Sequence, residues 1–221
     1  MPSQAKQSTT AAVPAPVPES RVARKRAERR RLVEQTAAEV FAQKGYDGAN
    51  FEEIAARLDM RGASLYYYYP SKEDLFLHAI ENATAEVLDR LRPIAESDLP
   101  AEERLRRLFI EQVLIETRDY PAFAPLFLMS VPVPAVAERL AELGRQHSMV
   151  FRTLAREVAK EHGVPRHQAS ISVLLALGSL SWLHSWYNPN GPLKLEQMAE
   201  EVADQLLQPF LGPDATVLKR A

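Results

Sequence analysis

Cysteine is absent from all 221 residues of the chain. This excludes disulfides, thiolate chemistry and cysteine-ligated metal sites, and it favours a reducing, cytoplasmic location. Long apolar runs are missing as well. The longest candidate, residues 171–186, is interrupted by polar residues, whereas a bilayer span needs about 18 consecutive apolar ones. We therefore expect no membrane partner.

Sequence signatures of catalysis are also lacking. The chain has no Gly-rich phosphate loop, no His-Glu-x-x-His pair and no nucleophile elbow. Adjacent carboxylates such as Glu52 and Glu53 point ~100° apart on a helix, so they do not form an acid–base pair. We expect neither an enzyme nor a cofactor or metal site.

The net charge is only −2 at pH 7, but the charges are unevenly distributed. Residues 21–31 contain seven Lys or Arg side chains and one acid, Glu28, whereas acids outnumber bases after Ile80. Such a basic run is typical of phosphate binding, although solvated tails show it too. The acidic remainder argues against a protein that binds DNA nonspecifically over its whole surface.

Helical periodicity extends over almost the whole chain after residue 26, without strand-like alternation. The sequence therefore predicts an all-α fold of about nine helices. We expect a disordered Pro/Ala-rich and basic arm over 1–26, a helix-turn-helix DNA-binding domain over 27–76, a helical ligand-binding and dimerisation domain over 77–214, and a tail over 215–221.

The N-terminal helices are predicted over residues 27–44, 50–58 and 62–69, followed by a long helix after Ser71. Asn50 suits the N-cap of the second helix, and Glu53 is placed to complete a capping box. Ser71 and Asp74 are spaced in the same way. The turn before the third helix is too short for antiparallel packing, so the second and third helices must cross steeply. Such a unit presents its last helix to the major groove of DNA.

Four consecutive tyrosines, residues 66–69, end the third helix. Successive helical residues point ~100° apart, so the four rings cannot share one buried face. Leu65 and Tyr69 are expected to point inward, which leaves the other three rings at least partly exposed. Exposed phenols suit phosphate oxygens and thymine methyl groups, and Lys72 adds a cation nearby. The alternatives are rings that pad an interdomain joint and a lysine that only decorates the surface.

Three segments form a long and specific pattern: Phe41-Ala42-Gln43-Lys44-Gly45-Tyr46, Phe51-Glu52-Glu53-Ile54-Ala55 and Leu65-Tyr66-Tyr67-Tyr68-Tyr69-Pro70-Ser71-Lys72-Glu73. The stretch that contains them, Arg31 to about Leu77, resembles the TetR family of bacterial repressors. The resemblance implies a homodimeric, ligand-responsive repressor that binds operator DNA. Carried over by position, it implies phosphate contacts at Asn50, Tyr67 and Lys72 and groove-facing residues at Arg61, Gly62, Ala63, Ser64, Tyr66 and Tyr68.

Four positions depart from the usual family pattern. The turn residue that is commonly Gly is Asp59, the cap that is commonly Ser is Arg61, the position often filled by Lys is Gly62, and the closing aromatic is Tyr69 in place of Phe. A bidentate base contact is worth about 1–3 kcal/mol, more than the cost of up to about 1 kcal/mol for a cation at a helix N-terminus. We therefore interpret Arg61 as a specificity residue, with Gly62 allowing close approach to DNA. The basic run is expected to act as a flexible arm in the minor groove.

For the C-terminal half, the resemblance implies a ligand pocket and a homodimer through the last two helices. Stripes at helical spacing suit either dimer packing or an intramolecular core: Ala169, Ser172, Ala176 and Ser179 on one helix, and Leu195, Met198, Val202 and Leu206 on the last. The candidate pocket residues are Phe123, Phe127, Met129, Phe151, Trp182 and Trp186, with His147, Arg152 and His184 as polar groups. Plain core packing is the alternative for each aromatic residue.

The effector is indicated only by a short stretch, residues 186–193, which is similar to TetR-type regulators of lipid and acyl-CoA catabolism. This implies an acyl-CoA or a fatty-acid-like effector first. A drug-sensing regulator of an efflux pump is the alternative within the same class, and a nonspecific DNA-binding protein is the alternative outside it. We expect the effector to release DNA by changing the tilt of the long helix after Ser71.

Overall fold

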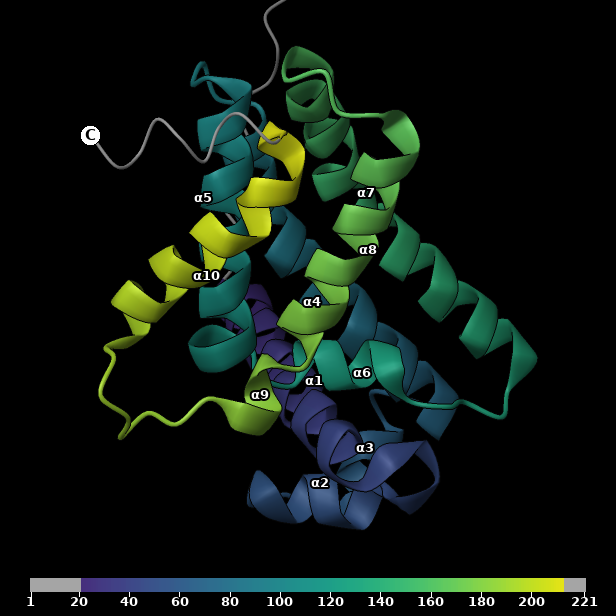
Figure 1. Cartoon of the computed structure of the whole chain (residues 1–221). Helices are drawn as coiled ribbons and strands as arrows, with labels where there is room; N and C mark the ends of the chain where they lie inside the picture. The colour runs from purple at the N-terminus through teal and green to yellow at the C-terminus, as the bar shows by residue number, and fades with distance from the viewer. Residues whose placement is uncertain (1–20, 213–221) are drawn as a thin grey trace, which may run out of the picture.

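The computed structural model describes residues 21–212, except for the side chains of His184 and Trp186. Over this range the chain forms ten α-helices and one π-helical turn, without β-strands (Figure 1). The elements are α1 (Arg21–Gly48), α2 (Phe51–Arg57), α3 (Gly62–Tyr66), α4 (Lys72–Ala95), α5 (Ala101–Leu114), η1 (Ile115–Asp119), α6 (Phe123–Leu128), α7 (Pro134–Glu161), α8 (Arg166–Ser181), α9 (Leu183–Trp186) and α10 (Leu195–Leu211). The predicted all-α fold of about nine helices is confirmed. None of these helices is long and apolar enough to cross a membrane.

The first hydrophobic core joins α1, α2 and α3 to the first half of α4. The ring of Phe41 on α1 lies edge-on to that of Phe76 on α4, with centroids 4.9 Å apart. Ile54 on α2 and Leu65 on α3 are fully buried beside them. Burial of these large side chains from four helices sets the angle at which α2 and α3 cross. The unit forms the lower end of the molecule, with α3 near the surface (Figure 1).

A second core lies among α5, α7, α8, α10 and the second half of α4. The short helix α6 belongs to both cores, because Phe123 packs in the second core while Ala122, just before α6, and Leu126 pack in the first. Leu140 and Leu143 on α7 also belong to the first core. The packing of the N-terminal unit therefore includes residues well beyond the expected boundary at 76, and α4 and α6 connect the two cores.

Helix α1 is longer than predicted. It begins at Arg21, so residues 21–26, which we expected within a disordered arm, are helical. Arginine, lysine and alanine dominate this segment and are good helix formers, so the basic composition does not interrupt the helix. The predicted arm before residue 21 and the residues after 212, which include the predicted tail, lie outside the described range.

Helix α3 is shorter than predicted, since it ends at Tyr66 rather than at residue 69. Tyr69 precedes Pro70, and the proline ring disfavours helical backbone at the residue before it. The chain therefore leaves the helix in a turn at Tyr67 and Tyr68 before α4 begins.

Candidate functional site

The caps of α2 and α4 fix the backbone around the exposed helix α3. The side chain of Asn50 accepts a hydrogen bond of 2.9 Å from the backbone N–H of Glu53, as predicted. The second half of the predicted capping box, in which the Glu53 side chain would accept from the backbone N–H of Asn50, is wrong. The Glu53 carboxylate instead pairs with Lys44 at 2.5 Å and Arg57 at 3.1 Å. At the start of α4, Ser71 caps the N–H of Asp74 at 3.1 Å.

The turn into α3 places Arg61 and the following residues at the surface. Asp59 carries this turn with a φ of 51°, a left-handed conformation that L-residues rarely adopt. Arg61 occupies the N-cap position without a side-chain cap and is exposed. A side chain at Gly62 would meet only Glu52, at 3.6–3.7 Å, so packing within the chain does not require glycine there. Ala63 and Ser64 are exposed beside it.

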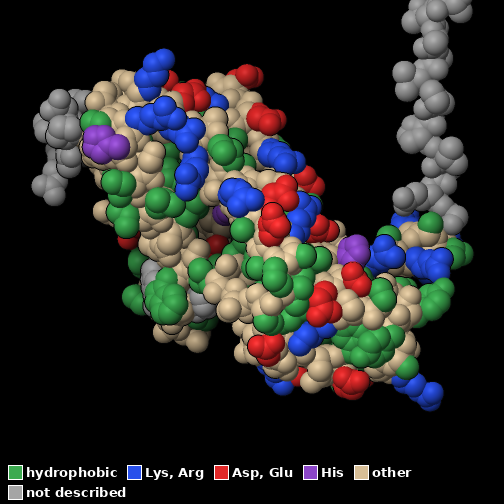
Figure 2. All heavy atoms as spheres, turned by 90° about the vertical axis from the view of Figure 1, so that its right-hand side faces the viewer, with side chains coloured by type: hydrophobic (Ala, Val, Ile, Leu, Met, Phe, Trp, Pro, Cys, Tyr) green, Lys and Arg blue, Asp and Glu red, His purple; other side chains and the backbone are tan. Residues whose placement is uncertain are grey.

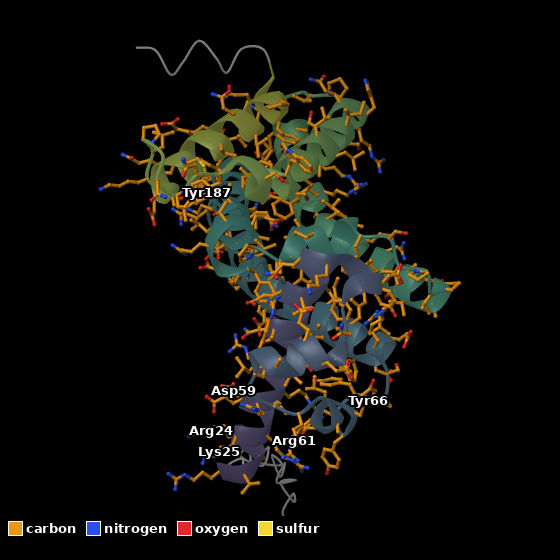
Figure 3. The ribbon with its side chains drawn as sticks, turned by 90° about the horizontal axis from the view of Figure 1, so that it is seen from below. Arg24, Lys25, Asp59, Arg61, Tyr66 and Tyr187 are labelled. Carbon is orange, nitrogen blue, oxygen red and sulfur yellow. The ribbon has the colours of Figure 1, made fainter. Side chains whose placement is uncertain are left out.

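The four tyrosines divide as the helical spacing predicted. Tyr69 is buried, whereas Tyr66 and Tyr67 are 55% and 75% exposed, and Tyr68 is half-buried. The Tyr66 ring packs on Phe51, with centroids 4.5 Å apart, and the Tyr67 ring meets Tyr68 edge-on at 5.4 Å. These contacts leave both phenol groups at the surface, and Figure 3 shows Tyr66 at the same end of the molecule as Arg61.

Lys72 has partners within the chain. Its Nζ donates a 2.9 Å hydrogen bond to the backbone carbonyl of Tyr46 and lies 4.7 Å from the centre of the Tyr46 ring. The Tyr46 hydroxyl in turn donates to Glu73 at 3.0 Å, and burial raises the pKa of Tyr46. Lys72 therefore joins the end of α1 to the start of α4 in this structure.

The helical basic residues at the start of α1 extend the charged surface next to α3. Arg26 reaches the Tyr67 hydroxyl at 3.5 Å, and Arg29 donates to the carbonyl of Leu58 at 3.3 Å. Arg24 and Lys25 lie at the same end of the molecule as Arg61 (Figure 3), and Figure 2 shows several Lys and Arg side chains close together near the start of α1. A positively charged, aromatic surface of this kind can contact phosphates and base edges.

The second candidate site is a polar cluster inside the helical domain. His147 on α7 lies 2.9 Å from Oε1 of Gln112 on α5, and the Gln112 amide donates to Oε1 of Glu116 at 2.8 Å. The rings of Phe123 and Phe151 pack against the His147 imidazole, with centroids 5.2 and 5.4 Å away. Because of this burial, the pKa of His147 is lowered to about 4 and that of Glu116 is raised to about 7.

Only some of the predicted pocket residues come together. Phe123, Phe127, His147 and Phe151 form one group. Met129 packs against the first core instead. Trp182 is 60% exposed, since the chain breaks between α8 and α9 and leaves its ring outside the core.

Arg152 is half-buried on α7, and its Nε is buried without a hydrogen bond. The side chains of His184 and Trp186 lie outside the described residues. Sequence reasoning missed Gln112 and Glu116. The available signal was two polar residues at helical spacing from the apolar residues Phe109 and Val113.

The expected small-residue stripe for dimerisation is wrong in part. Ala169 and Ala176 are buried within the chain, because this side of α8 packs on the second core. The apolar residues that α8 leaves exposed lie on another side: Ile171, Leu174 and Leu175. A cleft of about 620 Å³ lies between α8 and α10, lined by Leu183, Met198, Val202 and Leu206 among others.

The fold and the exposed helix α3 define a helix-turn-helix protein with a separate helical domain. Two family models match it: bacterial regulatory proteins, tetR family, over residues 35–79, and tetracyclin repressor-like, C-terminal domain, over residues 98–210. The chain therefore belongs to the TetR family of transcriptional regulators, a family of DNA-binding proteins and not of enzymes. This confirms the resemblance seen in the sequence.

Individual relatives agree with this assignment. An uncharacterized HTH-type transcriptional regulator of Bacillus subtilis, YerO, is 25% identical over 82% of this chain and 63% of its own. A second one, YuxN, is 29% identical over 56% of this chain and 43% of its own, so the chain spans less than two thirds of either relative.

Solved structures show the same fold. A TetR/AcrR-family regulator from Thermobifida fusca has a TM-score of 0.61 and 26% identity, covering 81% of this chain and 97% of its own. AibR, solved in complex with isovaleryl coenzyme A and operator DNA, has a TM-score of 0.72 and 21% identity, covering 82% of this chain and 99% of its own.

Proposed function

We propose that this protein is a homodimeric transcriptional repressor of the cytoplasm that binds a palindromic operator and is released from it by a small hydrophobic effector. The observation that carries the proposal is the exposure of Tyr66, at the same end of the molecule as Arg61, and of Tyr67, whose hydroxyl lies 3.5 Å from Arg26. Exposed aromatic side chains next to basic ones suit contacts with phosphates and base edges. On the proposed operator, Arg61, Gly62, Ala63, Ser64, Tyr66 and Tyr68 face the major groove, and Asn50, Tyr67 and Lys72 contact phosphates.

The caps and contacts of this region give Asn50 and Lys72 a second task. Each already holds a helix end in place, at α2 and at the junction of α1 with α4. Their substitution would therefore lower stability as well as DNA affinity. Tyr67 and Arg61 are the cleaner test residues, since both are exposed and neither belongs to a buried core.

The proposed dimer uses α8 and α10. Ile171, Leu174 and Leu175 are exposed on α8, and a largely apolar cleft lies between the end of α8 and α10. A second copy related by a two-fold axis would bury these side chains. The same axis would place two copies of α3 on operator half-sites about one helical turn apart.

The route from effector to DNA follows the two shared elements. Helix α4 begins at the DNA-binding unit and ends in the second core, and the segment around α6 packs in both cores. An effector that favours one position of these elements would change the distance between the two recognition helices of the dimer. The two recognition helices would then no longer match the spacing of the two operator half-sites, so DNA affinity would fall.

Two classes of effector are candidates. An acyl-CoA or fatty-acid-like molecule is supported by the sequence stretch 186–193 and by the isovaleryl coenzyme A in the complex of AibR. A hydrophobic drug-like molecule, as for a regulator of an efflux pump, is favoured by Glu116. Its buried carboxyl group lies beside the aromatic cluster, and in its ionised form it would repel the carboxylate of a fatty acid.

The experiment is a selection of binding sites from random duplex DNA at about 150 mM salt, because phosphate contacts make affinity salt-dependent. We expect an enriched palindrome with the native protein and a weakened or absent motif with Tyr67→Ala and Arg61→Ala. Arg145→Ala, an exposed arginine on α7, is the matched control and should select the same motif. A folded protein that enriches no motif would disprove the proposed sequence-specific repressor.

A further inference from the structure

Glu116 is a buried carboxyl group without a counter-ion. The residue is 3% exposed, and its Oε2 makes no hydrogen bond. Among the side chains that the structure describes, no Lys, Arg or His forms an ion pair with it. An incompletely paired buried carboxyl group lowers stability, so its presence points to a function that uses it.

The backbone at Glu116 is specialised as well. Helix α5 passes into the π-helical turn η1 at Ile115, and Glu116 is its second residue. π-helical turns often occur at functional sites, because the extra residue changes which side chains face inward. Gln112 and Glu116 both point into the second core and are joined by a hydrogen bond of 2.8 Å.

The surroundings arrange this carboxyl group as an acceptor. The Gln112 amide donates to Oε1, and the backbone N–H of Ala124 lies close enough to lower the pKa of the carboxyl group, against the larger effect of burial. Gln112 therefore presents its carbonyl oxygen to His147, whose Nε2 must donate. With its pKa lowered to about 4, His147 is neutral at pH 7 and supplies no positive charge.

Aromatic rings surround the same place. Phe123 and Phe151 pack on His147, and Phe127, which is only partly buried, packs on Phe123 at 4.9 Å. A positive charge next to aromatic rings and a carboxylate is stabilised by both. None of the hydrogen bonds or ring contacts described for Glu116 and these phenylalanine rings is with a Lys or Arg side chain.

We propose that the effector is a hydrophobic amine whose ammonium group donates to Oε2 of Glu116 and lies against these phenylalanine rings. The inference rests on the proposed function and names the chemical class of its effector. Because Phe123 and the N–H of Ala124 belong to α6, a molecule bound here displaces the segment that also packs, through Ala122 and Leu126, on the DNA-binding unit. Binding at Glu116 is thereby coupled to α1.

The test uses aryl-alkyl amines of increasing chain length, each compared with the alcohol and the carboxylate of the same skeleton. Binding to the full-length protein is measured by calorimetry. We expect at least one amine to bind about tenfold or more tightly than its alcohol and carboxylate counterparts. Glu116→Gln should remove this preference, whereas Glu103→Gln, a surface carboxylate on α5, should keep it.

Proton linkage gives a second readout. Calorimetry in two buffers at pH 7 should show proton release on amine binding, because the ammonium group favours the ionised carboxylate. Proton uptake, or a preference for the alcohol or carboxylate, would overturn the inference, since Glu116 would then act as a neutral donor. Failure of every amine to bind would overturn it too.

Operator binding separates this inference from the proposed function. Glu116→Gln should bind the selected operator normally and no longer be released by the amine. If the native protein binds the operator normally and no amine releases it, only the inference that the effector is an amine is refuted. Absence of operator binding by the native protein refutes the repressor itself.

Discussion

The hydroxyl of Tyr69 donates a 2.5 Å hydrogen bond to Oε1 of the buried Glu34, and so joins the segment after α3 to α1. The second oxygen of Glu34 accepts from the Asn82 amide on α4. A phenylalanine at this position would have no hydroxyl to donate. The Tyr69 hydroxyl therefore supplies a hydrogen-bond donor to Oε1 of the buried Glu34, which a ring without a hydroxyl could not provide.

Tyr69→Phe should lower the free energy of unfolding by about 1–3 kcal/mol, because the buried Glu34 oxygen would have one donor fewer. Urea unfolding followed by circular dichroism measures the difference. Tyr67→Phe is the matched control, since Tyr67 is 75% exposed, and it should change stability by less than about 0.5 kcal/mol. Equal stability of the two variants would show that the Tyr69 hydroxyl contributes nothing.

Asp59→Gly should stabilise the protein by up to about 1 kcal/mol, because Asp59 has a φ of 51° and glycine adopts this conformation without strain. Asp59→Ala should destabilise it instead, since alanine keeps the strain and has no polar side chain. Thermal unfolding of both variants tests the sign. A lower melting temperature for Asp59→Gly than for the native protein would contradict the argument from backbone strain.

Glu116 and His147 should make stability depend on pH in opposite directions. The pKa of Glu116 is raised from 4.5 to about 7 in the folded protein, so its contribution to stability is lost as pH rises through this window. The pKa of His147 is lowered from 6.5 to about 4, so its contribution is lost as pH falls through that window. Each effect is at most about 1.4 kcal/mol per pH unit.

The two effects oppose each other between about pH 4.5 and 6.5, and substitutions should separate them. Glu116→Gln should make stability rise more steeply with pH in this range, and His147→Gln should make it fall. Urea unfolding at a series of pH values provides the curves. If the curves of both variants ran parallel to that of the native protein, neither group would titrate as described.

The basic start of α1 should add phosphate contacts to operator binding. In the double variant Arg24→Gln/Lys25→Gln, the plot of log K for operator binding against log salt concentration should be less steep by about 0.9 for each phosphate that is no longer neutralised. The preferred DNA sequence should change little. Arg156→Gln with Lys160→Gln, two exposed residues on α7, is the matched control. An unchanged slope in the first variant would mean that this helical extension does not touch DNA.

The exposed apolar face of α8 should hold the dimer together. Leu175 is 69% exposed in the single chain, and Leu175→Glu would place a charge in the proposed interface, so the protein should become monomeric. Sedimentation velocity measures the change. Met149→Glu on α7, where Met149 is 50% exposed, should leave the association unchanged. A dimer that persists in Leu175→Glu would place the interface elsewhere.

The sequence by itself determined the features that depend on short-range geometry. The order of helices, the caps at Asn50 and Ser71, and the inward position of Tyr69 beside outward Tyr66 and Tyr67 all follow from spacings of three or four residues. These spacings depend on helix geometry alone, which is why they could be read without knowing what packs against them.

Only the tertiary structure decided the interior of the second domain and the partners of charged side chains. Gln112 and His147 are 35 residues apart, and nothing local indicates that they share a hydrogen bond. From the sequence, Lys72 could contact a DNA phosphate or another group of this chain. Its hydrogen bond to the carbonyl of Tyr46 depends on the packing of α1 against α4. In both cases the contact depends on how whole helices pack, and packing is set by the combined burial of many side chains.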